Sequence, residues 1–214
     1  MIPIVSIVGN SNSGKTTLIE KIIPELKKRG YKIATVKHDI HDFEIDRQRK
    51  DSWRHKKAGA HTTIISSPNK MAMIRDVESD LPLKELSLRF IKDVDIIISE
   101  GYKSDRHPKI EVYRKDMNRE LLCSKKDMLF ALASDKAFDI GLPCKDIDDI
   151  KGLVDLIEDR FLKKEKRASI ILRVNGKSIP LNTFVRDMVI RSISGMVSAL
   201  KDCEDPKEIE IMIS

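Results

Sequence analysis

Gly9-Asn10-Ser11-Asn12-Ser13-Gly14-Lys15-Thr16 follows the apolar run Ile4-Val5-Ser6-Ile7-Val8 and precedes a segment with helical periodicity. This Gly-x4-Gly-Lys-Thr loop between a strand and a helix predicts a site for nucleotide phosphates. Its glycines allow successive N–H groups to turn toward phosphate oxygens, and the helix adds its positive N-terminal end. We expect Lys15 to reach the terminal phosphates and the Thr16 hydroxyl to ligate Mg²⁺.

The composition is that of an ordinary folded domain. With 214 residues, 41% of them apolar, the chain can bury one sizeable core and a small satellite module. The net charge of +6 is mild, so it favours anionic small molecules or a basic patch and does not by itself imply nucleic acid. Three distant cysteines form no zinc or redox pair, and no run approaches the ~18 apolar residues of a membrane span. We therefore expect a soluble, cytoplasmic protein.

Strand and helix patterns alternate along the first three quarters of the chain, which predicts an α/β fold. We expect a P-loop NTPase with a mostly parallel sheet flanked by helices. The first helix should span Gly14 to Lys28, with a kink or break near Glu20 because Pro24 removes one N–H and clashes one turn back. Further strands are expected at residues 31–37, 62–66, 71–75, 95–99, 110–113 and 128–133, and further helices at 51–58, 83–91 and 150–162.

A charged segment at residues 163–167 ends the alternation of strands and helices, and a second pattern begins after it. Asn175-Gly176 predicts a tight hairpin turn, Asn182 or Thr183 should cap a long helix, and residues 209–213 alternate as a final strand. We therefore predict two domains: a nucleotide-binding domain at 1–163 and a small C-terminal ββαβ module at 167–214 that must dock on another surface.

A carboxylate completes the predicted nucleotide site. Glu100 ends the buried-strand pattern Ile96-Ile97-Ile98-Ser99, where ligands gather at the C-terminal edge of a parallel sheet. We interpret Glu100 as the organiser of the metal or of water, and the alternative is a solvated strand-end carboxylate. Asp95 lies five residues earlier, about 16 Å away at ~3.3 Å per residue, and should face the other end.

The segment from Lys37 to Ser52 begins at the same sheet edge and could fold over the triphosphate. Asp46 could bind Mg²⁺ or orient water, whereas Arg47, Arg49 or Lys50 could contact phosphates. His38 and His41 suggest a transition-metal site, but with no nearby thiol ordinary polar contacts are the favoured alternative. The basic residues between 47 and 57 indicate a solvated helix face rather than a nucleic-acid patch.

The chain resembles the molybdopterin-guanine dinucleotide biosynthesis protein B (MobB) adapters over roughly residues 2–163. The resemblance rests on the loop, on Val36-Lys37-His38, on the segment from Asp46 to Ala60, and on Glu100-Gly101-Tyr102-Lys103. It implies a GTP-binding homodimer of weak intrinsic hydrolysis that assists the MobA-type guanylyltransferase attaching GMP to molybdopterin. By position, the residues implied to bind phosphates are Gly9, Asn10, Ser11, Asn12, Ser13, Gly14, Lys15, Thr16 and Thr17, with Thr16, Asp46 and Glu100 serving Mg²⁺ and the attacking water.

Base recognition departs from the usual guanine signature. Asn69-Lys70-Met71-Ala72 lacks the aspartate of an Asn-Lys-x-Asp motif. Asp135, after the strand ending at residue 133, is the best substitute, because a carboxylate can accept from guanine N1 and N2; the alternative is a plain loop cap.

Two other functions use the same features. A small-molecule kinase would bind a substrate beneath the basic segment, and phosphoryl transfer to a pterin or nucleoside would reveal it. A metallochaperone GTPase would require clustered thiol or imidazole ligands, whereas only His38 and His41 are close together in sequence.

Overall fold

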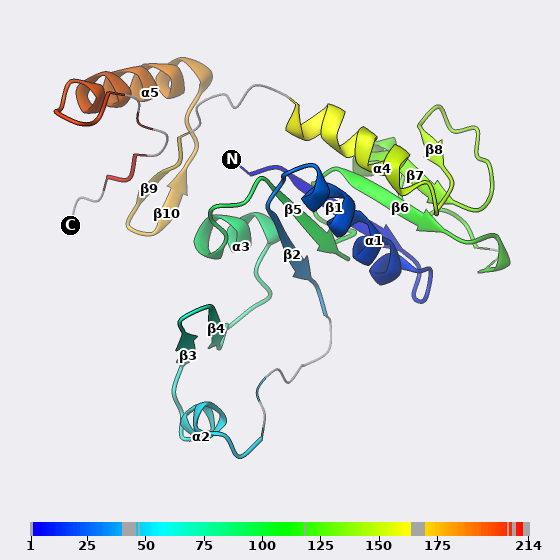
Figure 1. Ribbon diagram of the computed structural model, residues 1–214, viewed down its shortest axis with the longest axis horizontal. Helices are drawn as coiled ribbons and strands as arrows, with labels where there is room; N and C mark the ends of the chain where they lie inside the picture. Colours follow the sequence, from blue (N-terminus) through cyan, green and yellow to red (C-terminus); the bar gives the residue numbers. More distant parts are fainter. Residues whose placement is uncertain are drawn as a thin grey trace. The chain divides into compact units, whose positions relative to one another are not determined.

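The computed structural model describes residues 2–39, 46, 48–117, 119–163, 170–204, 206 and 209–211. The chain divides into two compact units, one made by residues 2–163 and one made by residues 164–214 (Figure 1). The first unit contains the phosphate loop and the sheet that positions it. Along the described residues, no helix is both long enough and apolar enough to cross a membrane.

A six-stranded sheet forms the centre of the first unit, in the order β2-β5-β1-β6-β7-β8. All of its paired strands are parallel. Parallel sheets are covered by helices on both faces, so their strands are nearly continuous runs of apolar residues, as the sequence shows here. The short strand β8 was not predicted from the sequence. The strands are β1 Ile4–Gly9, β2 Ile33–Lys37, β5 Ile96–Glu100, β6 Lys109–Tyr113, β7 Leu129–Ser134 and β8 Cys144–Lys145.

Helices cover both faces of this sheet (Figure 1). Helices α1 (Lys15–Lys28) and α4 (Ile150–Ile157) pack in one apolar cluster with Val5, Ile7 and Ile98. Helix α3 (Leu83–Phe90) packs on the other face, where alternate strand residues such as Ile4 and Ile97 point. The predicted helix at 150–162 is present, although its second half, Glu158–Leu162, winds as a π-helix.

The break that Pro24 was expected to cause near Glu20 is wrong. Helix α1 runs without interruption from Lys15 to Lys28, and Gly30 follows it with φ +90°. Ile22 and Leu26 on either side of Pro24 are completely buried, so the tertiary packing of this face holds the helix through the position where proline removes a backbone hydrogen bond.

Residues 51–75 form a small substructure outside the main sheet. Helix α2 (Asp51–Lys57) precedes an antiparallel hairpin of β3 (Thr62–Ser67) and β4 (Lys70–Arg75). The strands were predicted, but they pair only with each other in the described structure. Asn69 and Lys70 therefore belong to a hairpin end rather than to a base-reading loop.

The C-terminal unit contains a hairpin and one long helix. Strands β9 (Leu172–Val174) and β10 (Lys177–Ile179) flank Asn175 and Gly176, whose φ values of 50° and 75° match the predicted tight turn. Asn182 caps α5 (Thr183–Ser198) by accepting a hydrogen bond from the Val185 N–H at 2.9 Å. The described residues 209–211 do not form the expected final strand, and residues 212 and 213 lie outside the described part.

Candidate functional site

The phosphate loop occupies the turn between β1 and α1. Gly9 has φ +151° and Gly14 has φ +94°, values that side chains rarely tolerate. A Cβ on Gly9 would lie 2.6 Å from both the Val112 carbonyl oxygen and Ser13 Oγ. Glycine is therefore required at position 9 because the loop passes directly against the backbone of β6.

Lys15 bends back over this loop. Its Nζ donates to the carbonyl oxygens of Asn10 at 2.8 Å and Gly9 at 3.2 Å. Burial lowers the pKa of Lys15, an effect that nearby Glu100 opposes and Lys37 reinforces. The ammonium group thus lies over the loop, and its contact with phosphates stays a prediction.

Thr16 and Glu100 come together although they are 84 positions apart in sequence. The Thr16 hydroxyl lies 2.9 Å from one oxygen of the Glu100 carboxylate and 3.0 Å from the other. The pair arises because β5 lies beside β1 in parallel register, with Ile7 opposite Glu100. A hydroxyl and a carboxylate are hard oxygen donors, so this pair fits the preferences of Mg²⁺.

Asp46 makes a different set of contacts. It accepts a hydrogen bond at 3.0 Å from the Oγ of Ser52 in the first turn of α2. Within the described residues, its other oxygen is buried without a hydrogen-bond partner, and no contact links it with Thr16 or Glu100. Its predicted role beside the metal therefore stays a prediction, and Arg47 lies outside the described residues.

Asp135 lies after β7, close to the end of β6. One carboxylate oxygen accepts from the Lys115 N–H at 2.7 Å, and the other lies 3.6 Å from Arg114 Nη1. The first contact is that of a loop cap, which was the alternative interpretation of this residue. The Asp135 side chain is 30% exposed, and its role in base recognition stays a prediction.

Two arginines near the loop were missed in the sequence. The Arg114 guanidinium would lie 3.8 Å from a Cβ on Gly14, and Arg119 Nη1 donates to Asn10 Oδ1 at 3.3 Å. The segment that carries Arg119 is anchored by buried Glu111, which accepts from the N–H groups of Leu122 and Cys123. The sequence signal that could have identified Arg114 as a site residue is its position, because it directly follows β6, the strand adjacent to β1.

His38 makes ordinary polar and aromatic contacts. Its ring lies 4.6 Å from that of Tyr102, and its Nε2 lies 2.8 Å from Asp80 Oδ2. Across the residues that the structure describes, no three His, Cys, Asp or Glu side chains gather as metal ligands, and His41 lies outside this set. These contacts favour the polar interpretation of His38 over a transition-metal site.

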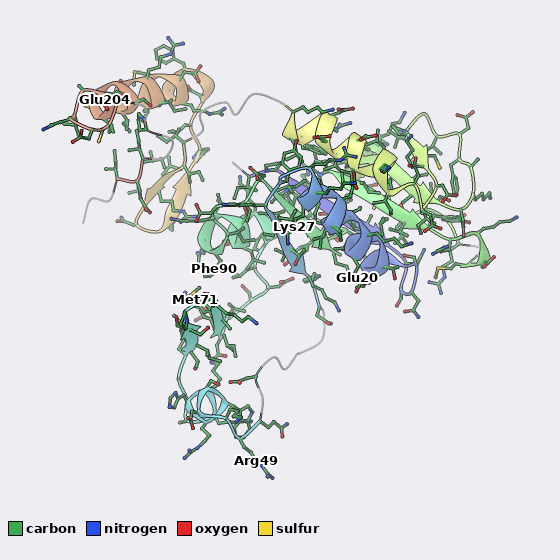
Figure 2. The ribbon with its side chains drawn as sticks, in the orientation of Figure 1. Glu20, Lys27, Arg49, Met71, Phe90 and Glu204 are labelled. Atoms are coloured by element: carbon green, nitrogen blue, oxygen red, sulfur yellow. The ribbon has the colours of Figure 1, made fainter. Side chains whose placement is uncertain are left out.

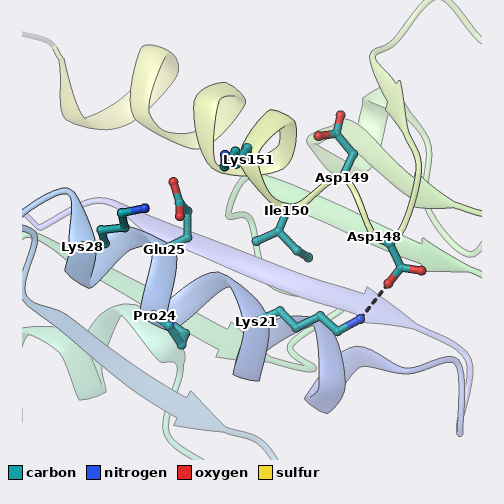
Figure 3. Close-up of a pocket in the computed structure, with 8 residues that line it drawn as sticks. All are labelled: Lys21, Pro24, Glu25, Lys28, Asp148, Asp149, Ile150 and Lys151. Atoms are coloured by element: carbon teal, nitrogen blue, oxygen red, sulfur yellow. Dashed lines mark hydrogen bonds and ion pairs between the residues drawn. The ribbon is translucent and has the colours of Figure 1, made fainter.

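A surface hollow of about 460 Å³ lies between α1 and the beginning of α4 (Figure 3). The ion pair between Lys21 Nζ and Asp148 Oδ1, at 2.6 Å, spans this hollow. Its lining has three lysines and three carboxylates and includes no residue of the phosphate loop. The hollow therefore offers neither a net charge nor an extension of the phosphate site.

The parallel sheet, the phosphate loop after β1 and Glu100 at the end of β5 define a P-loop NTPase fold. Residues 4–135 match the family of molybdopterin guanine dinucleotide synthesis protein B, MobB. The chain belongs to this MobB family, as its sequence resemblance indicated.

Relatives of known name support this assignment. The molybdopterin-guanine dinucleotide biosynthesis adapter protein of Haemophilus influenzae is 34% identical over 159 residues, covering 74% of this chain and 89% of that protein. A crystal structure of molybdopterin-guanine biosynthesis protein B matches with a TM-score of 0.59 and 31% identity, covering 74% of this chain and 98% of that chain. A Methanocaldococcus jannaschii relative, 29% identical, covers 98% of this chain and 97% of its own length. That match extends through most of the C-terminal unit.

We expect Gly9→Ala to destabilise the protein more than Gly59→Ala. Both positions have positive φ, but the space around Gly59 is open within 4 Å, whereas a Cβ at position 9 meets a backbone carbonyl. The added collision should cost about 1–3 kcal/mol beyond the shared backbone strain. Urea unfolding of both variants measures the difference, and equal losses would show that β6 does not constrain the loop.

Proposed function

We propose that the protein binds GTP with Mg²⁺, hydrolyses it slowly, and serves as an adapter in molybdopterin guanine dinucleotide biosynthesis. The observation that carries the proposal is the arrangement of Lys15 over the phosphate loop with the Thr16–Glu100 pair beside it, in a chain of the MobB family. We further propose that it assists the guanylyltransferase that attaches GMP to molybdopterin. The word "adapter" in the relatives' names supports this part of the proposal.

Each group of the site has a role that follows from its chemistry. The N–H groups from Asn10 to Thr17 and the α1 N-terminus stabilise phosphate charge, and Lys15 neutralises the terminal phosphates. Thr16 and Glu100 would hold Mg²⁺, which supplies neutralisation of the developing phosphate charge when bound. Glu100, with Asp46 if the segment around it closes, orients the attacking water.

We propose a homodimer as the working assembly. The hairpin β3–β4 exposes Ile64, Ile65, Met71 and Met73, of which Met71 is 69% exposed (Figure 2). A two-stranded hairpin is marginally stable by itself, and an exposed apolar surface of this kind favours burial against another chain.

The phosphate assignment predicts that Lys15→Ala weakens binding of Mg²⁺–GTP about tenfold to a hundredfold. Loss of a charge-assisted phosphate contact costs about 1.5–3 kcal/mol. Calorimetry with GTP and ATP measures the affinity, and guanylyltransferase assays with and without the variant measure the adapter role. Lys21→Ala is the matched control, because Lys21 lies on the same helix and pairs with Asp148 instead. Unchanged GTP affinity in folded Lys15→Ala would contradict the assignment.

Glu100→Gln should reduce Mg²⁺-dependent GTP hydrolysis at least about tenfold while changing GTP affinity less. The carboxylate would act mainly on water and on charge that develops in the transition state. Asp46→Asn should show the same division if its segment closes over the nucleotide. Single-turnover hydrolysis and equilibrium binding are the two measurements, and equal losses in both would assign the carboxylates a ground-state role.

Base recognition predicts that Asp135→Asn narrows the affinity gap between GTP and ATP. The amide oxygen can still accept from the Lys115 N–H, so the loop cap is retained, while the acceptor pair for guanine N1 and N2 is lost. Competitive binding of the two nucleotides measures the ratio. Asp135→Ala provides the comparison: a change seen only with alanine would assign Asp135 to the loop cap alone.

A further inference from the structure

Helix α5 exposes a row of large apolar side chains. Phe184 is 76% exposed, Met188 50%, Met196 65% and Leu200, just beyond the helix end, 60%. None of the described side chains between residues 170 and 211 is fully buried. The C-terminal unit therefore has no closed core of its own in the described structure, and its apolar surface requires a partner surface.

The exposed row has a regular and symmetric order. Positions 184, 188, 192, 196 and 200 are spaced by four residues, so they form one inclined ridge that turns by about 40° at each step, with Phe184 and Leu200 about 80° to either side of Ser192. Ser192 is the midpoint: Met188 and Met196 lie four residues to either side, and Phe184 and Leu200 lie eight residues to either side. The order of side-chain sizes along the ridge, two large, one small and two large, is therefore the same in both directions.

The neighbouring positions complement each other about the same midpoint. Val185 and Ala199 are each seven residues from Ser192, and Val189 and Gly195 are each three residues from it. In an antiparallel pair of these helices, Val185 would lie opposite the small Ala199 of the other copy, because both lie about 20° from the direction of Ser192, whereas Val189 and Gly195 lie about 60° to opposite sides of it. Gly195 and Ser192 leave little side-chain volume near the midpoint, so the two backbones can approach closely there.

We propose that α5 pairs antiparallel with α5 of a second copy of this chain, with the two-fold axis near Ser192. Such an interface is isologous, so the same surface of both copies must fit itself. The symmetric order of side-chain sizes along the ridge meets this requirement. The charged residues of α5, Arg186, Asp187 and Arg191, lie about 100–140° around the helix from Ser192, so no charge of this helix lies in the pairing face. This contact goes beyond the proposed nucleotide function and is independent of the hairpin β3–β4.

The unit that carries this face is shared with a relative. The Methanocaldococcus jannaschii protein aligns over 98% of this chain, whereas the Haemophilus influenzae protein covers 74% of it.

Disulfide trapping in the full chain tests the pairing. Cys144 and Cys203 are first replaced by serine, while the buried Cys123 is retained. Oxidation of the Ser192→Cys variant should give a disulfide-linked dimer as the major product, because position 192 faces itself across the axis. Met196→Cys is the matched control: two copies of this position would lie about 12 Å apart along the helix axis, beyond disulfide reach. Mixing Met188→Cys with Met196→Cys protein should give the heterodimer.

A charge placed in the face provides the second measurement. Met188→Glu, added to Ser192→Cys, should abolish the trapped dimer, whereas Lys177→Glu on β10 should leave it intact. No dimer with Ser192→Cys, self-trapping of Met196→Cys as efficient as that of Ser192→Cys, or a trapped dimer that survives Met188→Glu would each overturn the proposal. A face that covers the P-loop unit or a transferase would give the first of these results. Trapping is read without nucleotide, so a chain that bound no GTP but gave the Ser192 dimer would refute only the proposed function.

Discussion

The close approach of β1 to β6 at Gly9 is the constraint on which the site depends. The Val112 carbonyl lies where a side chain would stand, so the loop leaves β1 against the backbone of its neighbour. This position fixes where α1 begins, and the first turn of α1 carries Lys15 and Thr16. Because β5 borders β1 on its other side, Glu100 reaches Thr16. The cation, the hydroxyl and the carboxylate of the site therefore come together from one helix, α1, and one strand, β5.

The features that could be predicted from sequence are those set by local chemistry. The loop, the strand-end position of Glu100, the Asn175-Gly176 turn and the Asn182 cap each depend on residues within a few positions. The parallel sheet could also be predicted from the sequence, because runs such as Ile96-Ile97-Ile98 place apolar side chains on both faces of a strand. Local patterns thus identified most elements and the central part of the candidate site.

The features that could not be predicted depend on residues far apart in sequence. Pro24 favoured a break near Glu20, but burial of Ile22 and Leu26 in the core that covers the sheet holds the helix together. Arg119 carries no local motif, and it reaches Asn10 only because Glu111 anchors the following backbone. Likewise, the sequence suggested both a base reader and a loop cap for Asp135, and only the Lys115 contact revealed that the cap is formed.

The charges of the site are already compensated within the protein, and this limits what nucleotide binding can gain. Lys15 bonds to two carbonyls of its own loop, and the Thr16 hydroxyl is shared between both oxygens of Glu100. A phosphate and a metal ion bound as proposed would have to replace these bonds, so the net affinity would be a difference between two bonded states rather than the sum of new contacts. The bonds that Lys15 and the Thr16–Glu100 pair make within the protein therefore set the level of stabilisation that any phosphate or metal contact has to exceed.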